Sequence, residues 1–372
     1  MAKVLHILDS LNRGGAEVLA LDLCRNAAVN GLDLTFVATG GGDLESDFSS
    51  SGVEFLRLQR RLPVDLSLAS QLRQIIADRN IDIVHSHQPV EALHLYLATR
   101  GTRTKRVLTL HGFYPGTKND LALRFVLPRL DRGVVVSNEV LRLMTEKGLD
   151  SKANLTVIDN GVDVKRLKAP GKNLRDELGM AAEQVLFGMI GNFSPVAQKD
   201  QKTVCRALPK VFKQTPEAHF VFVGGRSDTA PQLFDGCVEI CRQAGISERV
   251  HFVGKRSDIG AVLQSLDVCV LSSLREGAPI SVIEAMLVGV PVLLSDIDPL
   301  REISGDGNYA TLFKAGDEID LAGQLTKMHE SSTQTRELAV AARQWAASKF
   351  SIEKHIKNLN RLYESIIIDL RA

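Results

Sequence analysis

The sequence predicts an α/β protein built from two doubly wound units, each a parallel sheet with helices between its strands. Short β-branched runs alternate with helical patterns over most of the chain, as parallel strands joined by crossover helices require. A polar segment at residues 160–179, with Pro170 and several glycines, interrupts this rhythm and indicates a linker with one short helix. The 372 residues also exceed the roughly 250–300 at which a single core stops growing.

These patterns place the individual elements. In the first unit we expect strands at 4–8, 34–38, 53–56, 83–85, 107–110, 133–136 and 155–158. We expect its helices to include 16–30, 66–80, 90–98, 120–130 and 138–147. The second unit should have strands at 185–190, 219–223, 250–253, 268–271 and 292–294, with helices at 202–214, 231–244, 259–265 and 280–288. After Phe313 the chain should be helical, from Glu318 to Ile368.

This organisation predicts domains at 1–165 and 166–350, followed by a C-terminal helix at 351–372 that packs back on the first domain. Ligands of open α/β sheets bind at the carboxyl ends of the strands. A cleft between the two domains is therefore the expected binding site.

Composition excludes several classes of protein. The chain is 44% hydrophobic and 24% charged, as soluble globular proteins are, and its net charge of +1 argues against a general nucleic-acid binder. No stretch approaches the roughly 20 apolar residues of a membrane span, and the N-terminal apolar run is too short for a signal peptide. We expect a cytoplasmic protein, at most attached to the inner face of the membrane. Its five cysteines are expected to be reduced and mostly buried.

The stretch "REGAPISVIEAMLVGVPVL", residues 275–293, is the strongest candidate for a site. Glu276 should lie in the loop after strand 268–271, and Glu284 about one turn into helix 280–288. Small residues, Gly277 and Ala278, precede Pro279 and the helix, whose free N–H groups and dipole suit a diphosphate. Carboxylates are good acceptors for sugar hydroxyls, so the two glutamates could hold a ribose and a hexose. The alternative is that both are solvated surface residues.

This stretch resembles the E-x7-E motif of the family 4 retaining glycosyltransferases, which have the GT-B architecture of two Rossmann-like domains across a cleft. Further segments resemble the family in the family's order, from about residue 3 to residue 303. They are "ILDSLNRGGAE", "IVHSHQ", "LTLHG", "VIDNGVD", "GNFSPVAQKDQ", "FVGKRSDI" and "LSDIDPLREI".

The resemblance implies transfer of a sugar from a nucleotide donor with retention of anomeric configuration, usually without a metal. The second domain would hold the donor and the first domain the acceptor. Glu284 matches the glutamate that binds the ribose hydroxyls, and Glu276 the one near the hydroxyls of the donor sugar. The turn whose amides approach sugar and phosphates is matched by Gly277, Ala278 and Pro279.

Departure of a nucleoside diphosphate needs positive charge, which Lys or Arg must supply when no metal is present. Lys199 matches the family's lysine, but the position of its arginine is occupied by Asn192, which can donate a hydrogen bond and carries no charge. Candidates to compensate are Arg226, Lys255 and Arg256, near predicted strand ends. The alternative for the last two is a solvated turn.

On the acceptor side, Gly14 and Gly15 follow the first strand and bare backbone amides toward the cleft, or else form a simple tight turn. His111 ends a strand, and the resemblance makes it the histidine that faces the donor sugar. His85 and His87 alternate along another strand end, and we interpret them as supporting or structural residues. We assign no general base, because in one-face retaining transfer the leaving phosphate takes the acceptor's proton.

A basic, apolar face on the acceptor domain could touch anionic lipid. It would combine residues 121–130, "LALRFVLPRL", with residues 101–106, "GTRTKR". Core packing of a crossover helix explains the first segment equally well.

Other readings fit less well. The only dehydrogenase-like glycine pattern, "GDGNYA" at 305–310, precedes a strand instead of following one. "DID" at 296–298 mimics a metal motif of the other glycosyltransferase fold, which has a single α/β unit. A phosphorylase, a GT-B sugar-nucleotide epimerase and a sugar-nucleotide-binding protein without transfer activity also share the architecture, and Asn192 keeps the last of these open.

The sequence thus predicts a metal-independent, retaining hexosyltransferase. It should move a hexose or N-acetylhexosamine from a nucleotide sugar, most commonly a UDP-sugar, to a saccharide or lipid-linked saccharide. Bacterial surface polysaccharide or lipopolysaccharide synthesis is the setting that the resemblance suggests. No cofactor and no nucleic-acid partner is expected.

Overall fold

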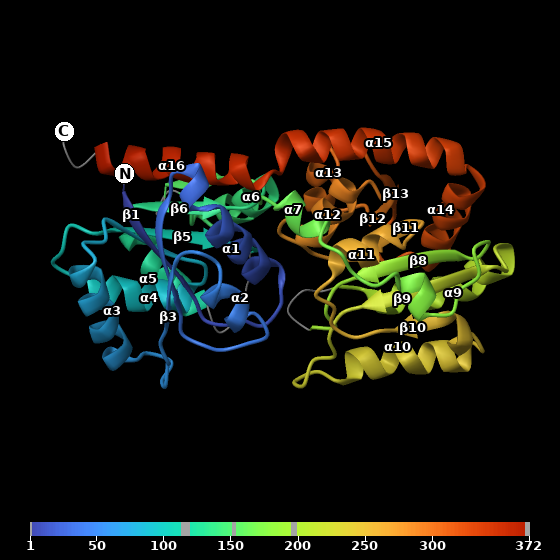
Figure 1. Cartoon of the computed structure of the whole chain (residues 1–372), viewed down its shortest axis with the longest axis horizontal. Helices are drawn as coiled ribbons and strands as arrows, with labels where there is room; N and C mark the ends of the chain where they lie inside the picture. Colours follow the sequence, from blue (N-terminus) through green and yellow to red (C-terminus); the bar gives the residue numbers. More distant parts are fainter. Residues whose placement is uncertain (1, 113–119, 151–153, 195–198, 369–372) are drawn as a thin grey trace. The chain divides into compact units, whose positions relative to one another are not determined.

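The computed structural model describes residues 2–112, 120–150, 154–194 and 199–368. The chain forms two compact units, unit 1 with Met1–Val162 and Phe350–Ala372 and unit 2 with Asp163–Lys349. Each unit is a parallel sheet with helices packed against it (Figure 1). The predicted α/β class is therefore confirmed. No helix within the described ranges is long and apolar enough to cross a membrane.

Unit 1 contains a seven-stranded sheet of order β3-β2-β1-β4-β5-β6-β7 among its described residues. Its strands are β1 Lys3–Leu8, β2 Asp33–Ala38, β3 Glu54–Arg57, β4 Ile83–Ser86, β5 Lys105–Leu110, β6 Arg132–Val135 and β7 Leu155–Val157. Its helices are α1 Gly15–Asn26, α2 Glu45–Ser49, α3 Leu66–Asp78, α4 Pro89–Thr99, α5 Asp120–Val126, α6 Asn138–Glu146 and α16 Ile352–Ile368. The strand order reverses between β1 and β4, where open sheets bind their ligands.

Unit 2 contains a six-stranded sheet of order β10-β9-β8-β11-β12-β13 in its described part. Its strands are β8 Val185–Ile190, β9 Ala218–Val223, β10 Val250–Phe252, β11 Val268–Leu271, β12 Val292–Ser295 and β13 Thr311–Phe313. Its helices are α7 Val164–Leu167, α8 Leu174–Glu177, α9 Gln201–Gln214, α10 Gln232–Gln243, α11 Ile259–Gln264, α12 Ile280–Val288, α13 Asp298–Ile303, α14 Glu318–Glu330 and α15 Ser332–Lys349. The order reverses between β8 and β11.

The C-terminal tail returns to unit 1 beside the point where the chain leaves it. The N–H of Val162 donates to the carbonyl of Phe350 at 2.9 Å, and the N–H of Ile352 donates back to the carbonyl of Val162 at 3.2 Å. Gly161 allows this crossing, because a Cβ there would lie 2.6 Å from the Cβ of His355. Helix α16 then packs on α1 and buries Tyr363 in the core of unit 1.

The structure corrects the prediction of a single helix in the linker. Two short helices form there, because Asp163 and Asn173 each accept a hydrogen bond from the backbone two residues ahead and so cap α7 and α8. Helices α2 and α13 and strand β13 were not predicted, since elements of three to six residues are too short to show a period. All five cysteines are buried thiols.

Candidate functional site

The loop between β11 and α12 carries the strongest predicted site. Pro279 precedes α12 in an extended conformation, and its side chain makes no capping hydrogen bond to the helix. Gly289 ends the helix with a φ of 92°, the left-handed value that glycine adopts without strain. The amino end of α12 therefore lies at the carboxyl end of β11, where backbone N–H groups of a helix's first turn suit an anion.

Glu276 lies in this loop and is joined to Lys199. The Lys199 Nζ is 2.7 Å from the Glu276 Oε1, and the hydroxyl of Ser273 donates to the same oxygen at 2.6 Å. The side chain of Lys199 is 12% exposed and that of Glu276 is 8% exposed. The loops are also tied through their backbones, since the N–H of Asp200 donates to the carbonyl of Ser272 at 2.8 Å. A cation and a carboxylate are thus held together where β8 and β11 end.

Glycines let two lysine stems lie close to neighbouring strand ends. A Cβ on Gly191 would lie 2.5 Å from the Cδ of Lys199, and one on Gly225 would lie 2.8 Å from the Cε of Lys255. Asn192 joins these loops, because its Oδ1 accepts the N–H of Gly225 at 2.8 Å. At the position of the family's arginine, this chain therefore has an acceptor that secures the loop after β9.

Replacing Gly191 by alanine is expected to lower any activity that depends on Lys199 by about tenfold or more, because the added methyl displaces the lysine stem. The fold should persist, since Gly191 has no left-handed φ and a flexible side chain can move. Activity and thermal unfolding of Gly191→Ala measure both effects. The matched control is Gly323→Ala, where an added Cβ meets nothing within 4 Å. Equal activity in the two variants would contradict the role of the glycine.

Glu284 is buried inside unit 2 and paired with Arg166. The Nη1 of Arg166, from α7, lies 2.8 Å from the Glu284 Oε1, and these side chains are 15% and 6% exposed. The alternative that Glu276 and Glu284 are solvated surface residues is therefore wrong. Arg166 was not singled out in the sequence, because nothing in the linker's pattern shows which helix face meets α12.

Two of the basic residues considered as compensating cations are paired elsewhere in unit 2. Arg226 donates to both carboxylate oxygens of Asp235, at 3.0 and 2.7 Å. Arg256 is held by the carboxylates of Glu177 and Asp258, with four contacts of 2.7–2.9 Å. These hydrogen bonds raise the pKa of Arg256 further. Lys255 is exposed, and its stem lies close to Gly225 at the end of β9.

Unit 1 gathers carboxyl groups at its own strand reversal. Gly14 precedes α1 and Gly15 is its first residue. The carboxyl of Glu17 lies so close to Gly14 that a Cβ there would be 2.5 Å from the Glu17 Oε2. Burial raises the pKa of Glu17 to about 7 and that of Glu91, in the first turn of α4, also to about 7. Burial also raises the pKa of Asp9, directly after β1. Asp9 and Glu17 are partly exposed and can exchange hydrogen bonds with a polar ligand, whereas Glu91 is fully buried. Of these residues, only the two glycines were predicted.

His111 follows β5 and is half-buried. Its Nε2 lies 3.0 Å from the Nδ1 of His87, so the predicted site histidine is in direct contact with one of the two histidines of "IVHSHQ". His85 is fully buried behind them. The loop at 195–198, within "GNFSPVAQKDQ", lies outside the described residues.

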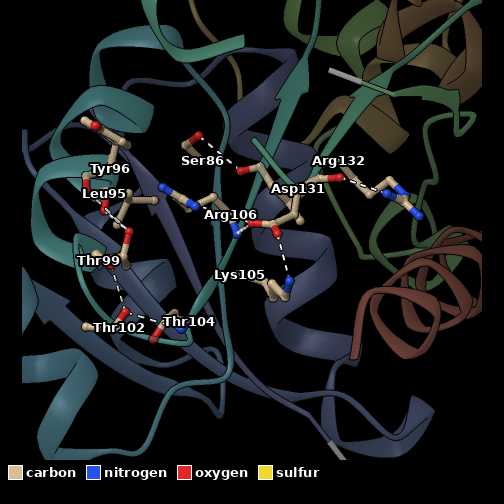
Figure 2. A network of polar contacts seen from close by, with 11 residues as sticks. Ser86, Leu95, Tyr96, Thr99, Thr102, Thr104, Lys105, Arg106, Asp131 and Arg132 are labelled. Carbon is tan, nitrogen blue, oxygen red and sulfur yellow. Dashed lines mark hydrogen bonds and ion pairs between the residues drawn. The ribbon is translucent and has the colours of Figure 1, made fainter. Parts of the chain in front are cut away.

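The basic segment at 101–106 is partly neutralised. Figure 2 shows Asp131 accepting from Lys105 Nζ at 3.0 Å and from the backbone N–H of Arg106 at 2.9 Å. On α5, Leu123 and Val126 belong to the core, whereas Leu121 and Phe125 are exposed. Core packing thus accounts for Leu123 and Val126, and the contact with lipid stays a prediction.

Comparisons with known proteins agree with this fold. The family model "Glycosyltransferase Family 4" matches residues 13–166, and "Glycosyl transferases group 1" matches residues 171–345. The N-acetyl-alpha-D-glucosaminyl L-malate synthase of Bacillus anthracis is 24% identical over 96% of this chain and 95% of its own. The Escherichia coli UDP-Gal:alpha-D-GlcNAc-diphosphoundecaprenol alpha-1,3-galactosyltransferase is 23% identical over 82% of this chain and 81% of its own.

A solved structure shares the fold over nearly the whole chain. The Anabaena protein Alr3699/HepE, crystallised in complex with UDP-glucose, superposes with a TM-score of 0.87 at 20% identity, covering 98% of this chain and 100% of that one. The two family models together account for most of the sequence and fall on the two units described above. The chain belongs to glycosyltransferase family 4 and has the GT-B fold.

Proposed function

We propose that this glycosyltransferase is a retaining, metal-independent hexosyltransferase that uses a UDP-sugar as its donor. The observation that carries the proposal is the Lys199–Glu276 pair beside the amino end of α12. It combines a cation for a leaving diphosphate with a carboxylate for sugar hydroxyls. The Anabaena protein of similar fold was crystallised in complex with UDP and with UDP-glucose, which supports the choice of nucleotide.

Each residue then has a defined role. Glu276 accepts hydrogen bonds from the donor sugar, and the amides from Gly277 to the first turn of α12 meet the phosphates together with Lys199. Glu284, oriented by Arg166, holds the ribose hydroxyls. Lys255 adds the charge that Asn192 does not supply.

Transfer then needs no base on the protein. The bond from C1 of the sugar to the diphosphate oxygen breaks, and the acceptor oxygen bonds C1 on the same face. The acceptor's proton passes to the departing phosphate oxygen. No metal is required where Lys199 and backbone amides stabilise that oxygen.

Product stereochemistry tests this directly. When the protein is incubated with UDP-glucose or UDP-N-acetylglucosamine, the sugar first released or transferred should have the donor's α configuration. One-dimensional proton NMR resolves the anomeric signals before mutarotation. A β product would contradict the retaining mechanism.

The acceptor is proposed to be a saccharide, free or lipid-linked, in bacterial surface polysaccharide synthesis. The partly exposed side chains of Asp9 and Glu17 and the backbone of Gly14 and Gly15 provide hydrogen-bonding groups for hydroxyls in unit 1. The Escherichia coli relative is named for a lipid-linked acceptor, a GlcNAc-diphosphoundecaprenol.

A peripheral membrane contact is part of this proposal. Leu121 is 79% exposed beside Phe125, and the guanidinium of Arg129 stacks over the Phe125 ring at 3.9 Å. Apolar and cationic groups together suit anionic lipid headgroups.

The protein should float with anionic vesicles at low salt, and Leu121→Ser/Phe125→Ser should remain in solution. Val29→Ser, which alters an equally exposed residue of unit 1, is the control. Flotation unaffected by the double substitution would exclude this surface.

A sugar-nucleotide-binding protein without transfer activity is the second candidate. Asn192 favours it, since the position of the family's arginine here has no charge and its side-chain oxygen is engaged with Gly225. Tight donor binding without release or transfer of sugar would support this alternative.

A further inference from the structure

A continuous chain of hydrogen bonds connects His111 to helix α16. His111 Nε2 meets His87 Nδ1 at 3.0 Å, and His87 Nε2 meets His6 Nδ1 at 2.9 Å. His6 Nε2 lies 2.9 Å from the hydroxyl of Tyr363, which lies 2.6 Å from His85 Nδ1. His85 Nε2 ends the chain at Thr109 Oγ1, 2.7 Å away.

Strand register brings these residues together. His6 on β1 is paired directly with His85 on β4, so their side chains project from the same face of the sheet. His87 follows two residues later, and Thr109 comes from the next strand, β5. Tyr363, only 1% exposed, reaches this face from α16. No local motif predicts this arrangement, because the tyrosine lies 357 positions from His6.

The four histidines of this hydrogen-bond network are uncharged near pH 7, because their pKa values are lowered. Burial lowers the pKa of His6 to about 3 and that of His111 to about 4, and it lowers the pKa of His85 and His87 well below the ordinary value. A neutral imidazole has one N–H donor and one acceptor nitrogen. Each ring must therefore donate on one side and accept on the other. The buried Tyr363 hydroxyl has one proton, which it donates to one neighbouring ring while it accepts from the other, because a buried proton without an acceptor is costly. All five hydrogen bonds then run in a single direction.

The buried end selects that direction. Thr109 is 5% exposed, and within the described ranges its hydroxyl has no partner other than His85. If His85 donated to Thr109, the hydroxyl proton of Thr109 would have no acceptor among the residues that the structure describes, and burying such a proton is costly. If Thr109 donates to His85, every internal donor is satisfied. His111 then accepts at Nε2 and carries its proton on Nδ1.

We propose that His6, His87 and Tyr363 are positioning residues that hold His111 as the Nδ1–H tautomer. His111 then offers the donor sugar a hydrogen-bond donor and not a base. The proposal rests on the proposed function together with the family resemblance, which implies that His111 faces that sugar. Presenting a lone pair at Nδ1 would require all five hydrogen bonds to reverse together.

The tautomer can be measured without activity. Nitrogen-15 chemical shifts of the ring of His111, assigned by comparison with His111→Ala, distinguish a protonated Nδ1 from a protonated Nε2. The proposal expects protonated Nδ1 in the wild-type protein. A protonated Nε2 would overturn it, whatever the enzyme's activity.

Kinetics tests whether the chain acts through His111. Tyr363→Phe removes the hydroxyl and keeps the ring, and should lower kcat about three- to tenfold with the donor KM unchanged. Thr109→Val should behave in the same way, whereas Thr109→Ser retains the hydroxyl and should restore activity. Tyr309→Phe, in unit 2, controls for loss of a tyrosine hydroxyl. Melting temperatures of all variants report any unfolding.

A double variant tests whether the Tyr363 hydroxyl acts through His111. Adding Tyr363→Phe to His111→Ala should cause no further loss of kcat, because the hydroxyl acts through the missing ring. Losses that multiply would overturn the positioning role. If His111→Ala alone leaves transfer unchanged, the proposed function of His111 fails, and the NMR measurement still decides the tautomer.

Discussion

Replacing Glu276 by glutamine should lower the rate of sugar transfer by about a hundredfold or more, with nucleotide affinity nearly unchanged. The carboxylate sits 2.7 Å from Lys199 and 2.6 Å from the Ser273 hydroxyl, so its orientation is set before any ligand binds. Glutamine keeps the shape and loses the charge that a sugar hydroxyl would meet. Initial rates with saturating donor, together with calorimetric affinity for UDP, separate catalysis from binding.

Glu248→Gln is the matched control, because Glu248 is an exposed carboxylate of the same unit outside the site. It should retain full activity. Unchanged transfer in Glu276→Gln would refute the assignment of the site. A parallel loss of UDP affinity would place Glu276 in nucleotide binding and not at the sugar.

Replacing Lys199 by methionine should reduce transfer by about a hundred- to a thousandfold, because the departing diphosphate loses its nearest cation. Arginine should rescue little, since the lysine stem lies against Gly191, where space is limiting. Donor turnover in Lys199→Met and Lys199→Arg, compared with the exposed Lys213→Met, measures this effect.

The same substitution has a consequence for stability. Lys199→Met leaves the Glu276 carboxylate, 8% exposed, without its cation. An uncompensated charge in such a position is destabilising, whereas removing both partners costs less. The melting temperature of Lys199→Met/Glu276→Gln should therefore exceed that of Lys199→Met, with transfer still absent. A double variant that is less stable than both single variants would contradict a direct pair.

Much of the fold could be predicted from the sequence, because long strands and amphipathic helices leave a regular pattern of apolar residues along the chain. The bounds of β8 and α12 are as predicted. The short elements α2, α13 and β13 could not be found in this way. The linker was recognised from its polar sequence, but its second helix, α8, depends on a single cap at Asn173.

The site was predicted less completely, because its residues meet across the sheet. Motif positions pointed to Glu276 and Lys199, but their contact spans 77 positions and follows from the adjacency of β8 and β11. Nothing local indicates that Arg166 reaches Glu284. The pairing of Arg256 with Glu177, 79 positions away, is equally invisible in the sequence.

Binding of nucleotide sugars to the wild-type protein tests the central claim most directly. Isothermal calorimetry with UDP-, GDP- and ADP-sugars, each measured with Mg²⁺ and with EDTA, reports both donor class and metal dependence. We predict tight binding of UDP-sugars that is the same under both conditions. Absence of binding to every nucleotide, or binding that requires Mg²⁺, would contradict a metal-independent donor site built on Lys199, Glu276 and Glu284.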